Sequence, residues 1–369
     1  MNILFVIQGE GRGHMTQAIA LADMLRRNGH RVVEALVGCS EMRQAPGFFH
    51  EQIQAPVQAF ASPNFLKTPD NKHFRIYRSI AYNLRWKCRK AYFSSIRFIA
   101  RRIDEMQPDL VVNFYEMLVG LACWRYKISV PVICVAHQFM FIHPAFVFSR
   151  RLTFTHRLLR LYTRICRLRA SKCLALSYAQ IPDVPREKLF VAPPLLRSDV
   201  LNLQSQTQPF LLGYILNHGF ADEITQWHAR HTETEVHVFW DKPDAPGTYT
   251  VHPNLTYHRL NYQLFTKMLG NCSAFFGTAG IEAVCEALYL GKPILVVPAH
   301  GEQQLNADYA AHAGVITAES FDLNPLLEKI SKPVHNNKFK EWADKSEEMI
   351  MKLLELQNEN EKSGHLYCH

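Results

Sequence analysis

Several features that would identify common protein classes are missing from this sequence of 369 residues. Its nine cysteines include no CxxC pair, so we expect reduced thiols, mostly small core residues, and no metal site. No apolar run has the length of a membrane-spanning helix, and no basic segment precedes the strand-like residues MNILFVI, so we expect a cytoplasmic protein. Helix-turn-helix, RNP and zinc-finger patterns are absent as well, which disfavours a nucleic-acid partner.

Acidic residues are missing from two long stretches of the first half. None lies between Asp70 and Asp104, and none between Glu116 and Asp183. Residues 1–195 carry 28 Lys and Arg against 12 Asp and Glu, whereas the remainder carries 13 against 21. A merely solvated surface would rarely lack acids over such lengths. We therefore expect the first half to meet something anionic.

The residues that are present predict an α/β fold in two parts. Apolar segments typical of strands alternate with helical segments, which indicates doubly wound parallel sheets. The expected strands include residues 2–6, 31–37, 110–113, 131–135, 173–177, 210–216, 236–240 and 294–297. Helices are expected at 16–28, within 73–106 and 150–170, and at 341–357. Because Ala192-Pro193-Pro194 interrupts the alternation, we expect domains at 1–192 and 193–369.

The most informative segment is 275–306, FFGTAGIEAVCEALYLGKPILVVPAHGEQQLN. A turn of small residues, Gly277, Thr278, Ala279 and Gly280, joins an apolar strand to the helix expected at 281–290. The N-terminal N–H groups of that helix and its dipole form an anion site. Gly280 permits close approach of a phosphate, and the Thr278 hydroxyl can donate a further hydrogen bond. The turn therefore predicts a diphosphate site.

Three acidic or amide side chains extend this site. Glu286 lies six residues after Gly280, roughly 9 Å further along the helix, which suits a carboxylate that accepts both ribose hydroxyls. Glu302 and Gln303 fall in the loop expected after the next strand, at the sheet edge where open α/β folds bind ligands. We expect this pair to bind the hydroxyls of a sugar.

The segment resembles the donor signature of GT-B glycosyltransferases, the superfamily of MurG and of the plant secondary-metabolite glucosyltransferases. Gly280, Glu286 and the closing Gly291-Lys292-Pro293 match its glycine, ribose-binding glutamate and Gly-x-Pro, and Glu302-Gln303 matches its sugar-binding pair. Thr278 stands where the plant enzymes carry a phosphate-binding histidine. The resemblance implies two Rossmann-like domains facing across a cleft, with the terminal helix returning to the first domain.

The glycine-rich loop after the first strand, Gly9-Glu10-Gly11-Arg12-Gly13-His14, has two interpretations. As a dinucleotide fingerprint with Glu34 as the ribose acid, it would need glycine where His14 stands. It also resembles the GGTGGH loop of MurG, which places Gly13 beside the donor and makes His14 the candidate general base. Alternatively, His14 only caps or orients the loop.

The same resemblance suggests further residues. Asn113 stands where the plant enzymes carry the aspartate that steadies this histidine, and Glu116 is a possible substitute on the acceptor side. His137 follows a strand similar to one before the MurG acceptor loop, so it is a candidate acceptor-binding residue, although a histidine there can simply satisfy backbone groups. Asn217, after the first strand of the second half, is a candidate donor-binding residue.

Two basic segments lie in the first half. Arg157, Arg160, Arg164 and Arg167 recur at helical spacing and form one stripe. Residues 71–103 hold ten Lys and Arg among the apolar residues Phe74, Tyr77, Leu84, Tyr92, Ile96, Ile99 and Ile103. The plain interpretation is core packing with a solvated outer face. Because acids are absent, we favour an anionic membrane surface, with the protein held peripherally on the inner face.

The sequence thus predicts a glycosyltransferase that moves a hexose or N-acetylhexosamine from a nucleotide-diphosphate sugar, with UDP as the expected nucleotide. The acceptor is expected to be a lipid or a lipid-linked glycan, and inversion is implied by the resemblance. The nucleotide sugar is a co-substrate, and neither a cofactor nor a metal is expected. Two alternatives stay open: a nucleotide-sugar 2-epimerase on the same fold, and a non-catalytic protein that retains the pocket.

Overall fold

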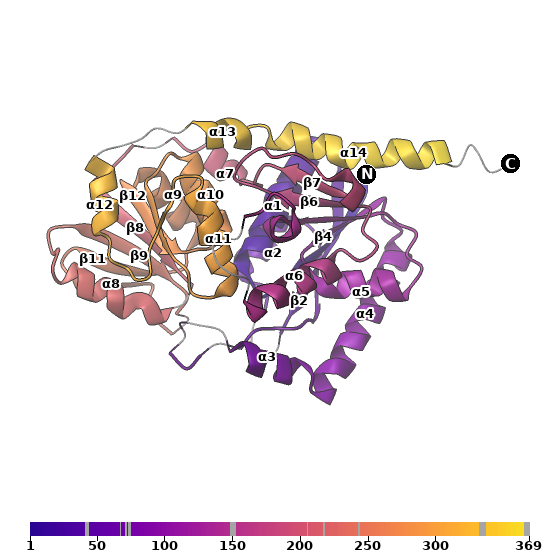
Figure 1. Ribbon diagram of the computed structural model, residues 1–369, viewed down its shortest axis with the longest axis horizontal. Helices are drawn as coiled ribbons and strands as arrows, with labels where there is room; N and C mark the ends of the chain where they lie inside the picture. Colours follow the sequence, from indigo (N-terminus) through magenta and orange to yellow (C-terminus); the bar gives the residue numbers. More distant parts are fainter. Residues whose placement is uncertain are drawn as a thin grey trace.

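The structure, a computed structural model, describes residues 1–40, 44–66, 68–70, 72, 75–147, 153–204, 206–216, 218–242, 244–331 and 337–364. Within these ranges the strands form two sheets of seven strands each, in two layered α/β domains that lie side by side (Figure 1). The predicted α/β class with two parallel sheets is confirmed.

The first sheet has the order β3-β2-β1-β4-β5-β6-β7, and all its strands are parallel. Its strands are β1 (Asn2–Gln8), β2 (Arg31–Cys39), β3 (Val57–Ala61), β4 (Leu110–Phe114), β5 (Val132–Ala136), β6 (Lys172–Leu176) and β7 (Leu189–Ala192). Helices cover both faces, so the central strands are apolar along nearly their whole length. These helices are α1 (Arg12–Arg27), α2 (Gly47–Ile53), α3 (Ile76–Asn83), α4 (Trp86–Met106), α5 (Met117–Arg125), α6 (Phe154–Cys166) and the short η1 (His137–Ile142) and η2 (Pro185–Glu187).

The second sheet has the order β10-β11-β9-β8-β12-β13-β14 and is parallel except for its edge strand β10. Its strands are β8 (Phe210–Ile215), β9 (Glu235–Trp240), β10 (Thr248–His252), β11 (Leu255–Arg259), β12 (Ala274–Thr278), β13 (Ile294–Val297) and β14 (Ile316–Thr317). The accompanying helices are α7 (Ser198–Leu201), η3 (His218–Phe220), α8 (Ala221–His228), α9 (Tyr262–Asn271), α10 (Ile281–Tyr289), α11 (Gly301–Ala311) and α12 (Asn324–Ser331).

The last two helices, α13 (Lys338–Ala343) and α14 (Ser346–Gly364), run back along the molecule to the first domain (Figure 1). Ile350 and Leu354 are fully buried in the core of the first domain. Trp342 donates its indole N–H to the carbonyl of Ser177, and the Lys172 ammonium donates to the carbonyl of Leu353. The C-terminal helices therefore tie the second domain to the first.

Two expected boundaries are wrong in ways that affect the site. Helix α1 begins at Arg12 and not at Thr16, so Gly13 and His14 lie in its first turn, after the extended Gly11. Residues 301–311 form helix α11, so Glu302 and Gln303 lie in a helical first turn and not in a loop. In both places the helix begins directly after an extended residue, Gly11 or His300, without the intervening loop that the sequence suggested.

Two further features bear on the predictions about the cysteines and about membrane-spanning helices. The eight cysteines in the described ranges are free, and all of them except Cys88 are buried. Among the helices of the described residues, none is both long and apolar enough to cross a membrane.

Candidate active site

A cavity of about 920 Å³ lies between the two domains, at the ends of the strands where ligands of open α/β sheets bind. Side chains of both domains line it. Seven of the predicted site residues do so: Gly13, His14, His137, Gly280, Glu286, Glu302 and Gln303. The fold therefore brings the predicted base, the predicted ribose acid and the predicted sugar acid to one space.

Four predicted residues are placed elsewhere, and a fifth cannot be placed. Gly277, Thr278 and Ala279 are buried at the end of β12 and its turn, outside the lining of the cavity. A Cβ atom at Gly277 would lie 2.5 Å from the carbonyl oxygen of Tyr214, so this glycine serves the packing of β12 against β8. Glu116 caps α5 and also lies outside the cavity lining. Asn217 lies outside the described residues.

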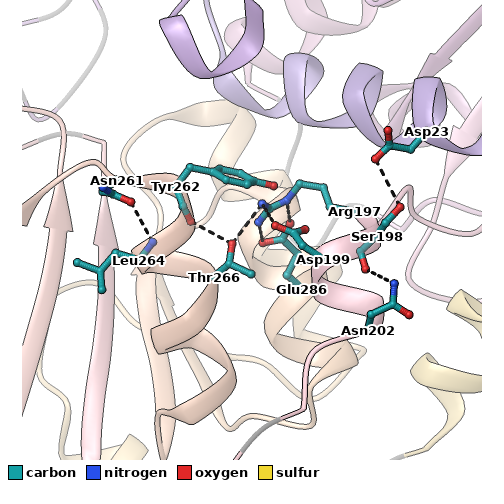
Figure 2. Close-up of polar contacts among 10 residues, drawn as sticks. All are labelled: Asp23, Arg197, Ser198, Asp199, Asn202, Asn261, Tyr262, Leu264, Thr266 and Glu286. Carbon is teal, nitrogen blue, oxygen red and sulfur yellow. Dashed lines mark hydrogen bonds and ion pairs between the residues drawn. The ribbon is translucent and has the colours of Figure 1, made fainter. Parts of the chain in front are cut away.

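Glu286 is buried on α10 and is bound by an arginine that the sequence did not indicate. Arg197 Nε donates to Glu286 Oε1 at 2.6 Å, and the terminal Nη2 donates to Oε2 at 2.8 Å (Figure 2). Such a two-point contact fixes the rotamer of the carboxylate. The two oxygens of a carboxylate offer about four acceptor positions, of which Arg197 uses two.

The guanidinium of Arg197 is itself held on several sides. Its central carbon lies 3.7 Å from the ring centre of Tyr262, and Nη1 donates to the Thr266 hydroxyl at 3.2 Å (Figure 2). The Tyr262 ring also stacks on Phe48 of the first domain, with 5.6 Å between ring centres. Arg197 follows the interdomain linker, so Glu286 is held by a residue at the junction of the domains.

Glu282 lies in the first turn of α10, where the diphosphate is expected. Its Oε1 accepts a hydrogen bond of 2.6 Å from the Gln17 amide of α1, and its Cγ would lie 3.3 Å from a Cβ atom at Gly13. Burial raises the pKa of Glu282 to about 8; the Gln17 hydrogen bond and Arg197 oppose this shift, and the charge of Glu286 adds to it. At neutral pH this side chain is therefore mostly an uncharged acid, so it adds little negative charge at the start of α10.

His14 is enclosed between two glutamines. Its Nδ1 lies 3.4 Å from Gln17 Oε1, and its Nε2 lies 3.2 Å from the amide nitrogen of Gln138. This arrangement assigns the proton to Nδ1 and leaves Nε2 as the acceptor. Burial lowers the pKa of His14 to about 4; the charge of His137 adds to this, while Glu302 and the Gln17 hydrogen bond oppose it. The imidazole is thus neutral at pH 7.

Glu302 connects the domains at the floor of the cavity. Its Oε1 accepts a hydrogen bond of 2.9 Å from the Gln138 amide and lies 3.6 Å from His137 Nε2. Burial alone would raise the pKa of Glu302, but its electrostatic interaction with His137, and to a smaller extent with His300, lowers it to about 2. Glu302 is therefore a carboxylate over the whole physiological range.

The profile of one protein family, described as glycosyl transferase family 1, matches residues 1–331. The chain belongs to this family. A curated relative, an uncharacterized glycosyltransferase of Methanosarcina acetivorans, is 23% identical over 341 residues, which are 85% of this chain and 82% of the relative. The protein is accordingly a glycosyltransferase, and the assignment made from segment 275–306 is confirmed.

Solved structures of distant glycosyltransferases share the fold. The Arabidopsis thaliana enzyme UGT89C1, solved with UDP, is 13% identical, with a TM-score of 0.58 and 94% of each chain covered. MurG of Acinetobacter baumannii is 16% identical, with a TM-score of 0.52 and coverage of 96% of this chain and 99% of that chain. The GT-B fold predicted from sequence is thereby confirmed for this glycosyltransferase.

The support expected for the base of this glycosyltransferase is different from what the resemblance implied. Glu116 accepts hydrogen bonds from the Ser62 hydroxyl and the Leu118 N–H, and burial, partly offset by these bonds, raises its pKa to about 7. The Asn113 amide donates to the carbonyls of Glu116 and Cys166. The hydrogen-bond partners of His14 are instead glutamines, because Asn113 and Glu116 are committed to capping and packing around α5.

The side-chain oxygen of Gln303 is also already used in a hydrogen bond within the protein. Its Oε1 accepts from the N–H of Ala299 at 2.8 Å, which closes the turn before α11. The remaining polar group of this cavity-lining residue is its amide N–H₂, a donor. Three residues that reasoning from sequence missed, Arg197, Gln138 and Glu282, have roles that depend on partners 89, 164 and 265 residues away. No local spacing could have indicated them.

The basic stripe of α6 is only partly exposed. Arg157 and Arg164 are exposed, whereas Arg160 is half-buried. Arg167 donates to the carbonyl of Glu187 and also faces the Glu187 carboxylate at 3.8 Å. The stripe therefore presents fewer outward charges than the helical spacing predicts.

Proposed function

We propose that this glycosyltransferase transfers a hexose or N-acetylhexosamine from a UDP-linked sugar to a hydroxyl group of a lipid or lipid-linked glycan, with inversion at the anomeric carbon. One observation carries the proposal: the start of α10, Glu286 and Glu302 line one side of a single cavity, and His14 lines it from the other domain. A donor and an acceptor can meet there.

The donor is proposed to bind along α10 and α11. The N–H groups at the start of α10, next to Gly280, favour the diphosphate because of the helix dipole. Glu286 would accept the ribose hydroxyls with the acceptor positions that Arg197 leaves open. Glu302 and the amide of Gln303 would bind hydroxyls of the sugar. That a structural relative was solved with UDP supports uridine as the base.

The reaction is proposed to be a single displacement. The acceptor hydroxyl takes the place of the Gln138 amide at Nε2 of His14, which removes the hydroxyl proton. The acceptor oxygen then forms the new bond to the anomeric carbon, and the bond from that carbon to the diphosphate oxygen breaks. The start of α10 stabilises the charge of the departing diphosphate, so the step requires no group beyond the residues named.

An acceptor with a lipid part is supported by the basic character of the first domain. This domain holds most of the Lys and Arg residues of the chain, and the segment 71–103 contains neither Asp nor Glu. Attraction to anionic headgroups is about 1 kcal/mol for each basic residue near the surface, so several act together. We therefore propose that the protein binds peripherally to a membrane.

A thermal-shift series followed by a transfer assay tests the proposal. UDP and UDP-sugars at about 100 times their Kd should stabilise the protein by about 2.7 kcal/mol, whereas GDP and nucleoside monophosphates should stabilise it less. With a UDP-sugar and a membrane extract, a labelled sugar should move into the lipid fraction. Conversion of the donor without any acceptor would instead establish a 2-epimerase, and stabilisation without either reaction would indicate a binding protein.

A further inference from the structure

The cavity has two chemically different parts. One part holds His14, Glu286 and Glu302, whereas the part lined by α3 and α6 is mostly apolar; Ser79 and Asn83 also line it, but their side chains are hydrogen-bonded to the protein. Helices α3 and α6 supply the apolar part with Ile76, Ile80, Leu84, Leu158, Leu161 and Ile165. Neither a sugar nor a nucleotide carries a long apolar group that could pack against such a surface. We call this part the apolar arm.

Large apolar side chains stand exposed where the apolar arm opens. We name four of them the aromatic lip: Tyr77 (75% exposed), Leu84 (64%), Trp86 (77%) and Phe154 (57%). Tyr77 of α3 stacks on Phe154 of α6 with 6.1 Å between nearly parallel rings, so the lip joins both helices of the arm. Leu84 belongs to the arm and to the lip, which makes the two surfaces continuous.

The exposed apolar side chains of α4 lie in its first half, where Phe93 is exposed as well as Trp86, and α6 exposes Leu161 in addition to Phe154. Further along α4, Ile96, Ile99 and Ile103 are buried as core residues. Tyr77 and Leu84, expected from their spacing to pack in the same way, do not, and Phe74 lies outside the described residues. Figure 1 shows α3 and the start of α4 at the edge of the first domain, beyond the sheet that buries the rest of α4.

The charges around the lip are of one sign. Arg78, Arg85, Arg89 and Lys90 are exposed on α3, α4 and the turn between them. Aromatic rings next to cations, without acids, match the headgroup layer of an anionic membrane, where Trp and Tyr rings sit between water and hydrocarbon. An anionic bilayer matches both features of this surface at once, because its headgroups pair with the cations while its hydrocarbon receives the apolar side chains.

We infer that the aromatic lip inserts into the headgroup layer of an anionic bilayer and opens the apolar arm toward it, so that the hydrocarbon part of a lipid acceptor enters between α3 and α6. The inference that the lip inserts depends only on the exposed rings and the charges around them. The entry of the acceptor rests on the proposed function, since it assumes that the acceptor is a lipid.

Tryptophan fluorescence tests the insertion without any donor or acceptor. Trp227, Trp240 and Trp342 are buried, and Trp86 and Trp124 are exposed, the latter at 63% on α5. Vesicles of phosphatidylglycerol and brominated phosphatidylcholine should quench the wild type. Trp86→Phe should remove most of this quenching, and Trp124→Phe should keep it. Equal quenching in the wild type and Trp86→Phe, or loss in Trp124→Phe instead, would overturn the assignment of the lip.

A co-sedimentation experiment separates insertion from charge attraction. At 1 M salt the Debye length is about 3 Å, so binding that persists reports apolar insertion. The double variant Tyr77→Ser, Phe154→Ser should weaken this persistent binding by about tenfold or more, equivalent to 1.4 kcal/mol. UDP affinity should stay unchanged, which shows that the variant is folded. If the wild type leaves the vesicles completely at 1 M salt, the lip does not insert, while donor binding and transfer to a soluble acceptor would remain to judge the proposed function separately.

Discussion

Arg197 donates a hydrogen bond to each carboxylate oxygen of Glu286, although 89 residues separate Arg197 from Glu286 in the chain. Both side chains are almost completely buried, and the ring of Tyr262 covers the guanidinium. A buried carboxylate is costly without such a partner, so the arginine offsets the burial of Glu286. The ion pair also connects α10 to the segment between the domains.

Breaking this ion pair should affect stability and binding differently. Arg197→Met leaves Glu286 buried without its partner and should lower the free energy of unfolding by about 3–5 kcal/mol. Glu286→Ala should weaken UDP binding by roughly 1.5–3 kcal/mol, because the ribose hydroxyls lose a charged acceptor. Urea unfolding and calorimetry with UDP measure the two effects.

The double variant Arg197→Met, Glu286→Leu provides the control for stability. It should recover most of the unfolding free energy lost in Arg197→Met, because no buried charge remains unpaired. It should still bind UDP poorly. An unchanged Kd for UDP in Glu286→Ala would place the ribose elsewhere and remove the main support for the donor site.

Removing the imidazole of His14 should slow turnover without affecting donor binding. His14→Ala is expected to lower kcat by roughly 10² to 10⁴ while the Kd for UDP stays close to that of the wild type. His312, exposed at the end of α11, offers a control, since His312→Ala should change neither quantity. Near-wild-type kcat in His14→Ala would reduce His14 to a residue that orders the start of α1.

Donor affinity should depend on the protonation of Glu282. Its folded-state pKa is raised to about 8, so the acid is neutral below this pH and gains a negative charge above it. That charge would face the diphosphate at the start of α10, so the Kd for UDP should rise as the pH increases through 8. In Glu282→Gln the rise should disappear, because the amide cannot ionise.

Calorimetry between pH 6 and 9.5 provides this measurement, with Glu319→Gln as the control for an exposed carboxylate of the same domain. The titration of UDP itself is common to all variants, so only the difference between them counts. Parallel pH profiles of wild type and Glu282→Gln would mean that the diphosphate does not approach this side chain.

Reasoning from sequence succeeded where the relevant residues share one element. Gly280 caps the helix that carries Glu286, and the rise per residue sets their separation along it, so this separation could be predicted without knowing the fold. The alternation of apolar segments likewise predicts the two parallel sheets, since each buried strand must be covered by helices. Family membership follows from the same local pattern.

Tertiary structure alone decided the contacts between distant segments. Glu302 meets Gln138 only because the two domains dock across a cavity, and Arg197 meets Glu286 only because the segment after the linker packs against α10. No periodicity in the chain encodes either contact. The helical spacing of Tyr77 and Leu84 is the same as that of core residues, yet both stay exposed since α3 and the start of α4 extend past the sheet. Periodicity states which side chains share a face of a helix, and only packing determines whether that face meets protein or solvent.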